Sequence, residues 1–136
     1  MYAGADYDEA REVIITKLCV AAPSVIQLPK DLIINFAWLG NTVHGTTAVQ
    51  HRFKNRISIN NMLTLEQIPA VLIHELIHVE QIHIKRLRVA HGIYYWDGTP
   101  HSLKNTLYEN LPWEADVVEK QQQILIDILA IAMING

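Results

Sequence analysis

Hydrophobic positions recur with a helical period in three stretches of the chain. In the first stretch they are Ala10, Val13, Ile14 and Leu18. Acidic residues stand early in this stretch, where the helix dipole favours them, so we predict a helix over Asp6 to Cys19. The same spacing predicts a central helix from Leu65 to about Ile82. A last helix is expected from Pro112, a residue suited to a first helical turn, to about Met133.

Between the first two predicted helices the pattern changes to short runs of β-branched and aromatic residues. The runs cover Leu32 to Trp38, Thr42 to Gln50 and Asn55 to Asn60, and each is typical of a strand. Gly40-Asn41 is a plausible hairpin turn between the first two runs. These features predict three strands in an antiparallel sheet.

After the central helix, Arg86 to Trp96 has the composition of extended chain, and Asp97-Gly98 marks a turn. We therefore expect a hairpin or covering loop there. No internal repeat or low-complexity linker is present, which favours a single domain over residues 1–136. The order of elements predicts an α+β fold, with a small, mainly antiparallel, twisted sheet packed on the central helix and further helices at both ends.

Composition excludes several classes of function. The chain has 136 residues, and 11 basic against 14 acidic side chains give a net charge of −3, which argues against a nucleic-acid partner. Half of the residues are hydrophobic and 18% are charged, as in a folded globule. The longest apolar run, Ile124 to Ile134, is interrupted by Asp127 and is shorter than the roughly 20 residues of a membrane span. A single cysteine, Cys19, and a polar N-terminus predict no disulfide framework and no signal peptide, and favour a reducing, cytoplasmic location.

The central helix carries the sequence His74-Glu75-Leu76-Ile77-His78, an HExxH pattern. Two histidines four residues apart on a helix lie one turn above each other, so both imidazoles can bind one ion. Zinc prefers such ligands, and a catalytic zinc takes three protein ligands and keeps one open position. Glu75 would stand beside that position as a general base, taking a proton from water and passing it to a leaving amine.

The surroundings of the motif favour a metal over a pair of hydrogen-bonded core histidines. Most of the circumference of the helix is apolar. A buried helix would not direct His74, Glu75 and His78 toward one arc without a partner for them. The pattern in which glycine and a third histidine follow the motif is absent, because Gln81 and Ile84 occupy those positions.

The third ligand is expected from the last helix. Glu114 lies at the head of its apolar stripe, in which Gln121 is the one polar exception, whereas Asp116 falls on the opposite side. A carboxylate on a core-facing stripe needs a counter-charge, which a metal supplies. We therefore predict Glu114 as the third ligand. The alternatives are His91, His101 and Glu109.

These residues resemble a known family. HELIHVEQ, the extended NRISIN before it, and LPWEADVVE, whose Glu114 follows the second histidine by 114 − 78 = 36 residues, resemble the gluzincin branch of zincin-like metallopeptidases. More narrowly, they are similar to small single-domain zincins with HExxHxxQ and a later PxE, common in bacterial and bacteriophage genomes. The resemblance covers roughly Asn55 to Lys120. It implies a minimal zincin fold with a substrate-aligning edge strand, with His74, His78 and Glu114 on Zn²⁺ and Glu75 as base.

One departure concerns the surroundings of the ligands. Larger gluzincins often carry an acidic residue four positions after the third ligand, where this chain has Val118, so no carboxylate that orients a histidine is identified. No motif assigns an oxyanion stabiliser either. The candidates by side-chain chemistry are Tyr94, Tyr95, His101 and Tyr108.

The predicted function is a zinc-dependent peptidase-type hydrolase that acts on a peptide or protein substrate. The alternative is a zincin-like structural or assembly component, for example of a bacteriophage virion, in which zinc is a fold staple with little turnover. In that case the location would be virion-associated rather than cytoplasmic. The C-terminal helix has apolar residues outside its main stripe, Ile126 and Ile131, which suit a contact in a homo-oligomer or a larger assembly.

Overall fold

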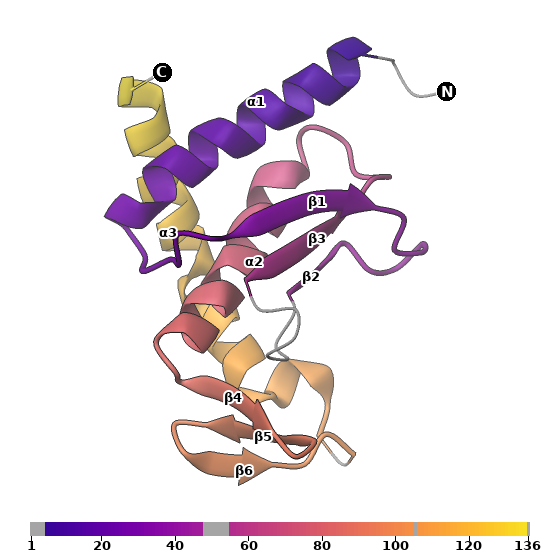
Figure 1. Ribbon diagram of the computed structural model, residues 1–136, viewed down its shortest axis with the longest axis vertical. Helices are drawn as coiled ribbons and strands as arrows, with labels where there is room; N and C mark the ends of the chain where they lie inside the picture. Colours follow the sequence, from indigo (N-terminus) through magenta and orange to yellow (C-terminus); the bar gives the residue numbers. More distant parts are fainter. Residues whose placement is uncertain (1–4, 48–54, 105, 136) are drawn as a thin grey trace.

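Three α-helices and two three-stranded sheets form the part of the chain that the structure, a computed structural model, describes, namely residues 5–47, 55–104 and 106–135 (Figure 1). The helices are α1 (Ala5–Ala21), α2 (Ile68–His83) and α3 (Pro112–Asn135). Two short 3-10 helices, η1 (Ala22–Ser24) and η3 (Tyr108–Asn110), precede β1 and α3. The predicted α+β class and all three predicted helices are therefore confirmed.

The first sheet contains β1 (Ile33–Ala37), β2 (Gly45–Thr47) and β3 (Arg56–Asn60), in the order β1-β3-β2. β2 is antiparallel to β3, but β1 runs parallel to it. The predicted hairpin at Gly40-Asn41 is therefore wrong, because β1 and β2 lie on opposite sides of β3. The prediction of a mainly antiparallel sheet on the central helix is also wrong, because this sheet is mixed.

Asn60, at the end of β3, explains why the chain does not turn back on β1. Its side-chain amide donates to the carbonyl oxygens of Gly40 and Val43, both at 2.8 Å. These two bonds hold the segment that follows β1 across the end of β3. The chain then forms β2 on the side of β3 that is opposite β1. The parallel register also places apolar residues of both strands on one face, over the core: Ile34, Phe36, Ile57 and Ile59. Residues 48–50 of the predicted second strand lie outside the described residues.

The second sheet contains β4 (Leu87–Ala90), β5 (Ile93–Trp96) and β6 (Thr99–His101), joined as two antiparallel hairpins. The predicted turn at Asp97-Gly98 is confirmed, and both of its residues have positive φ, 49° and 85°. This sheet lies beyond the C-terminal end of α2 (Figure 1). Beneath it is a small apolar cluster of its own, in which Leu87 contacts Leu111 and Trp113 near the start of α3.

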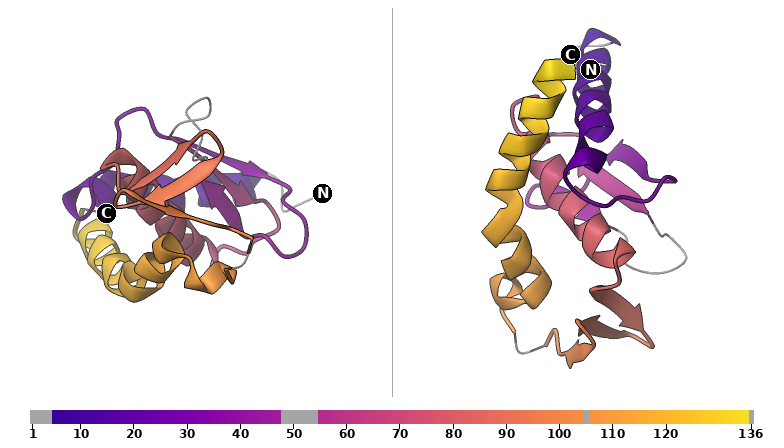
Figure 2. Two further views of the ribbon diagram at one scale, coloured as in Figure 1. Left: turned by 90° about the horizontal axis from the view of Figure 1, so that it is seen from below. Right: turned by 90° about the vertical axis from the view of Figure 1, so that its left-hand side faces the viewer.

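The central helix α2 lies between the first sheet and α3, and it contacts α1 as well (Figures 1 and 2). It begins at Ile68, next to Pro69. Proline suits this position because it has no backbone N–H, and the N–H groups of a first helical turn have no partner within the helix. Its residues Ile73, Leu76 and Ile77 are fully buried in the main core. Since α2 is enclosed on most sides, Glu75, His78 and Gln81 are buried polar side chains and need hydrogen-bond partners within the protein.

The last turns of α3 differ from its first ones. Ile126, Met133 and Ile134 are 51%, 81% and 84% exposed, whereas Val117 and Ile128 are fully buried. Of the two apolar residues predicted to lie outside the main stripe, Ile126 is exposed, whereas Ile131 is partly buried and packs against the main core. Within the described ranges, no helix is long and apolar enough to cross a membrane.

Candidate metal centre

α2 and α3 bring His74, His78 and Glu114 together. The two histidines are four residues apart on α2, and Glu114 lies in the first turn of α3. Oε1 of Glu114 is 3.4 Å from Nε2 of His74 and 3.1 Å from Nε2 of His78. His78 and Glu114 are buried, and His74 is partly exposed. The three predicted ligands are the group of metal-ligating side chains found among the described residues.

Gln81 determines which nitrogen of His78 carries the proton. Its amide nitrogen donates to the carbonyl oxygen of Trp113 and to Oδ2 of Asp116, both at 2.9 Å, and both partners can only accept. The amide oxygen of Gln81 therefore faces Nδ1 of His78, at 2.8 Å, and Nδ1 must be the donor. A neutral His78 consequently turns the lone pair of Nε2 toward Glu114.

The same oxygen of Glu114 thus meets ring nitrogens that carry lone pairs. Neutral His78 and the ionised carboxylate are both acceptors at 3.1 Å and repel each other unless a proton or a cation lies between them. A proton bridges only two atoms, whereas Nε2 of His74 also converges on this oxygen. A metal ion can be shared by all three, which is why the arrangement fits one.

Two of the separations between donor atoms also fit a small tetrahedral ion. Ligand atoms about 2.0–2.1 Å from such an ion lie roughly 3.3–3.4 Å apart. The two separations from Glu114, 3.1 and 3.4 Å, are close to this value. Two imidazoles and a carboxylate form the donor set of known three-ligand zinc sites that keep a fourth position open.

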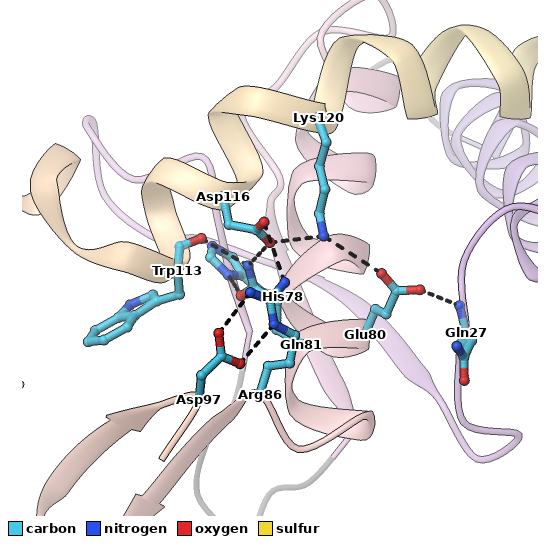
Figure 3. Close-up of polar contacts among 9 residues, drawn as sticks. All are labelled: Gln27, His78, Glu80, Gln81, Arg86, Asp97, Trp113, Asp116 and Lys120. Atoms are coloured by element: carbon cyan, nitrogen blue, oxygen red, sulfur yellow. Dashed lines mark hydrogen bonds and ion pairs between the residues drawn. The ribbon is translucent and has the colours of Figure 1, made fainter. Parts of the chain in front are cut away.

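A polar network supports His78 from behind (Figure 3). Asp116, which holds the amide of Gln81, also forms ion pairs with Lys120 at 2.9 Å and Arg86 at 3.6 Å. Burial alone would raise the pKa of Asp116, but the hydrogen bond from Gln81 and the charge of Lys120 lower it. The carboxylate that sequence reasoning did not identify is therefore Asp116, and it acts on His78 through Gln81.

A second glutamine supports His74. Oε1 of Gln121, about two turns along α3 from Glu114, lies 2.9 Å from Nδ1 of His74. Gln121 is the polar exception in the apolar stripe of α3, and this contact explains it. The neighbouring carboxylate of Glu114 raises the pKa of His74, and the contact with Gln121 adds to the effect.

Glu114 stays ionised although it is buried. Burial by itself would raise its pKa, but its contacts with His74, His78 and Tyr108 outweigh that effect and hold the pKa at about 2. Partial burial of the hydroxyl, with the neighbouring carboxylates of Glu114 and Glu75 adding to the effect, raises the pKa of Tyr108 above its usual range. A low pKa favours the ionised form of Glu114, which suits a cation site.

Glu75 faces the same space without belonging to the ligand group. It is 6% exposed, and the hydroxyl of Thr47 on β2 donates to its Oε1 at 2.7 Å. Burial raises the pKa of Glu75, while the hydrogen bond from Thr47 opposes the rise. β2 approaches closely because Gly45 has no side chain: a Cβ there would lie 3.1 Å from Cγ of Glu75 and 3.0 Å from Val71.

Two pockets open on either side of Glu75, with volumes of about 420 and 600 Å³. Tyr108 and Glu75 line both pockets. Among the four residues predicted as oxyanion stabilisers, Tyr108 is therefore the one that borders both sides of Glu75. Of these two pockets, Tyr94 lines the smaller one, where it stacks on Trp113. Two of the four candidates lie elsewhere: Tyr95 lies under Arg88 on the second sheet, and His101 meets the edge of Trp113.

The remaining third-ligand candidates are not part of the group. His91 is exposed in the turn between β4 and β5, and Glu109 is exposed in η3. Sequence reasoning did not find Thr47, Asp116 or the partners of the two glutamines. The available signals were weak: a polar residue inside an apolar stripe, and a glutamine three positions after the second histidine.

His74, His78 and Glu114 could hold a divalent metal ion, and a buried carboxylate, that of Glu75, lines the same pockets. Comparisons with protein family models, with curated proteins and with solved structures find no match for this chain. Function is therefore inferred from the residues of the site and their contacts.

Proposed function

We propose that this protein is a zinc-dependent, peptidase-type hydrolase with a minimal zincin fold of the gluzincin type. One observation carries the proposal: two imidazoles and a carboxylate turn acceptor atoms toward one point, and Gln81 holds the His78 tautomer that makes this so. The α+β arrangement supports the fold assignment, because the helix that bears the ligands packs under a small sheet whose edge strand, β2, borders the site.

His74, His78 and Glu114 would hold the zinc ion. When bound, zinc supplies a Lewis acid that acidifies a coordinated water and polarises a carbonyl oxygen. The outer contacts keep the donor atoms in place: Gln121 supports His74, and Gln81 with Asp116 supports His78. Such contacts orient the rings and lower the entropy cost of binding the ion.

Glu75 is proposed as the general base. Burial raises its pKa, which brings a carboxylate closer to the range in which it both accepts and returns a proton near neutral pH. The Thr47 hydroxyl holds Oε1, so the side chain is fixed in one orientation. Glu75 would take a proton from the attacking water and give it to the leaving amine of the cleaved amide.

Tyr108 is proposed to stabilise the developing oxyanion. Its high pKa keeps the phenol protonated, so that it can donate a hydrogen bond. It lines both pockets next to Glu75, between the two sides on which a peptide would extend. We expect Tyr108→Phe to lower kcat while zinc binding persists.

The rival function, a structural or assembly component, is favoured by one observation. Ile126, Met133 and Ile134 expose a continuous apolar end of α3, which suits contact with another chain. A structural zinc, however, has no use for the buried Glu75 beside it, since burying an ionisable group without a task is costly. The hydrolase is therefore the better-supported proposal.

Two measurements test the proposal. Metal analysis of purified protein should find about one zinc per chain, lost in Glu114→Ala, since a site with two of its three ligands binds weakly. Wild type should then cleave members of a mixed peptide library, and Glu75→Gln, which keeps the shape and the metal, should not. Metal-free, well-folded wild type would overturn the zinc centre, and equal, negligible cleavage by both proteins would leave only the structural role.

A further inference from the structure

The smaller pocket beside the centre has an apolar wall that the catalytic groups do not need. Its floor contains Glu75, His78 and Glu114, and it extends from there toward the second sheet. The wall consists of Leu87, Tyr94, Leu103, Leu111 and Trp113. Apart from the three floor residues, no residue that lines this pocket carries a charge. A charged substrate side chain would find no partner there, whereas an apolar one would be removed from water.

The wall is rigid on its inner side. Leu87 and Trp113 are 1% and 5% exposed and belong to the small apolar cluster under the second sheet. The ring of Tyr94 stacks on Trp113 with 5.4 Å between centroids and 18° between planes. Two stacked rings offer a broad flat surface, on which an aromatic or branched aliphatic side chain packs well.

The larger pocket, on the other side of Glu75, is of a different kind. Its residues away from the centre are smaller than those of the apolar wall, and two of them are polar: Thr42, Val43, His44, Ala70 and Val71. It lacks the aromatic wall of the smaller pocket. The two sides of a bound peptide would therefore meet unequal surfaces, and selection by size and polarity is expected on one side.

β2 relates the two pockets to the direction of a bound peptide. Along β2 the chain passes from the larger pocket, lined by Thr42 and His44, to the smaller one, lined by Thr47. Within the described residues β2 is an edge strand, and peptides commonly add to such edges. Antiparallel pairing, the commoner and more stable kind, would place the part of the peptide before the scissile bond over the smaller pocket.

We propose that the pocket formed by Leu87, Tyr94, Leu103, Leu111 and Trp113 selects a large apolar side chain on the substrate residue that precedes the scissile bond. The proposal rests on the proposed function and names its substrate class: peptides with Phe, Tyr, Leu or Met at that position. Full burial of such a side chain corresponds to a preference on the order of 10- to 100-fold over Gly or Asp.

Leu103 offers a test with little risk to folding, because it is 47% exposed. In Leu103→Glu, zinc-loaded protein should lose the preference for Phe and Leu and gain cleavage after Lys and Arg. Leu107→Glu is the matched control: it adds the same charge in the same loop, at a residue that is 65% exposed and does not line the pocket. Cleavage sites in a peptide library, read by mass spectrometry, give both profiles. A wild-type profile without apolar preference before the bond would overturn the proposal and leave the hydrolase intact.

A second readout does not depend on cleavage. In zinc-loaded Glu75→Gln, the indole N–H resonance of Trp113 should shift on titration with N-acetyl-phenylalaninamide and not with the aspartate analogue. Equal responses to the two probes, or none, would overturn the apolar pocket even if the protein is a peptidase. If wild type cleaves nothing in the library, the proposed function fails, while a selective Trp113 response would still support an apolar binding pocket.

Discussion

His78 and Gln81 lie on adjacent turns of α2, and Oε1 of Gln81 accepts a hydrogen bond of 2.8 Å from Nδ1 of His78. The direction of this bond follows from the other end of the amide, whose two partners can only accept. It turns the lone pair of Nε2 toward Glu114. A single glutamine therefore turns the acceptor nitrogen of a buried histidine toward the group that could hold a metal ion.

Replacing Gln81 should weaken metal binding without removing a ligand. In Gln81→Leu, a side chain of similar size keeps the helix and the packing, but His78 loses the group that orients its ring. We expect zinc affinity to fall about 10- to 100-fold, the usual effect of losing such an outer contact. Competition with a chromophoric chelator measures the change.

The control is Gln122→Leu, an equivalent substitution at an exposed position of α3. It should leave zinc affinity unchanged. If Gln81→Leu, folded by circular dichroism, bound zinc as tightly as wild type, the role assigned to Gln81 would be wrong.

Removing zinc should lower the stability of the whole domain, because the ligands come from α2 and α3. Without the ion, only protons can separate the carboxylate oxygen of buried Glu114 from the ring nitrogens of the two histidines. At free zinc 100 times the dissociation constant, binding contributes about 2.7 kcal/mol, which corresponds to a rise in Tm on the order of 10 °C. Calorimetry of chelated and reloaded protein measures the shift, and Glu114→Ala should show none.

The hydroxyl of Thr47 should matter for turnover and not for metal binding. Thr47→Val leaves the buried carboxylate of Glu75 without the donor that lies 2.7 Å from Oε1. Since a hydrogen bond to a charged group contributes about 1.5–3 kcal/mol, we expect kcat/KM to fall by roughly 10-fold or more. Thr47→Ser keeps the hydroxyl and should restore most of the activity. Loss of zinc in Thr47→Val would instead indicate a structural role for this residue.

Cys19 should be a slow thiol in the folded protein. It lies on α1 against the main core, and burial raises its pKa from 9.0 to about 11. Only the thiolate reacts with disulfide reagents, so at pH 8 labelling should be on the order of 100-fold slower than in the unfolded chain and should accelerate as the pH rises toward 11. A chromogenic disulfide reagent with and without guanidinium measures both rates. Equal rates would contradict the burial of this thiol.

Local spacing was sufficient to predict the elements of the site that lie on helices. His74 and His78 share a face because four residues make about one helical turn, and this holds wherever the helix packs. The apolar stripe of α3 likewise predicted that Glu114 turns inward, and the structure brings it to the histidines. Both predictions depended only on contacts within one helix.

Tertiary structure decided the features that join distant segments. The parallel pairing of β1 with β3 depends on Asn60 and the segment it holds, 17 to 20 residues earlier. Asp116 was predicted to lie on the side of α3 opposite Glu114. On that side its carboxylate accepts a hydrogen bond from Gln81 of α2, a partner that the pattern of α3 alone does not indicate. Periodicity describes one element at a time, whereas the partner of a polar side chain depends on which element packs against it. The sequence alone therefore predicted the three residues that could hold a metal ion, and packing determined the residues that orient them and the pocket beside them.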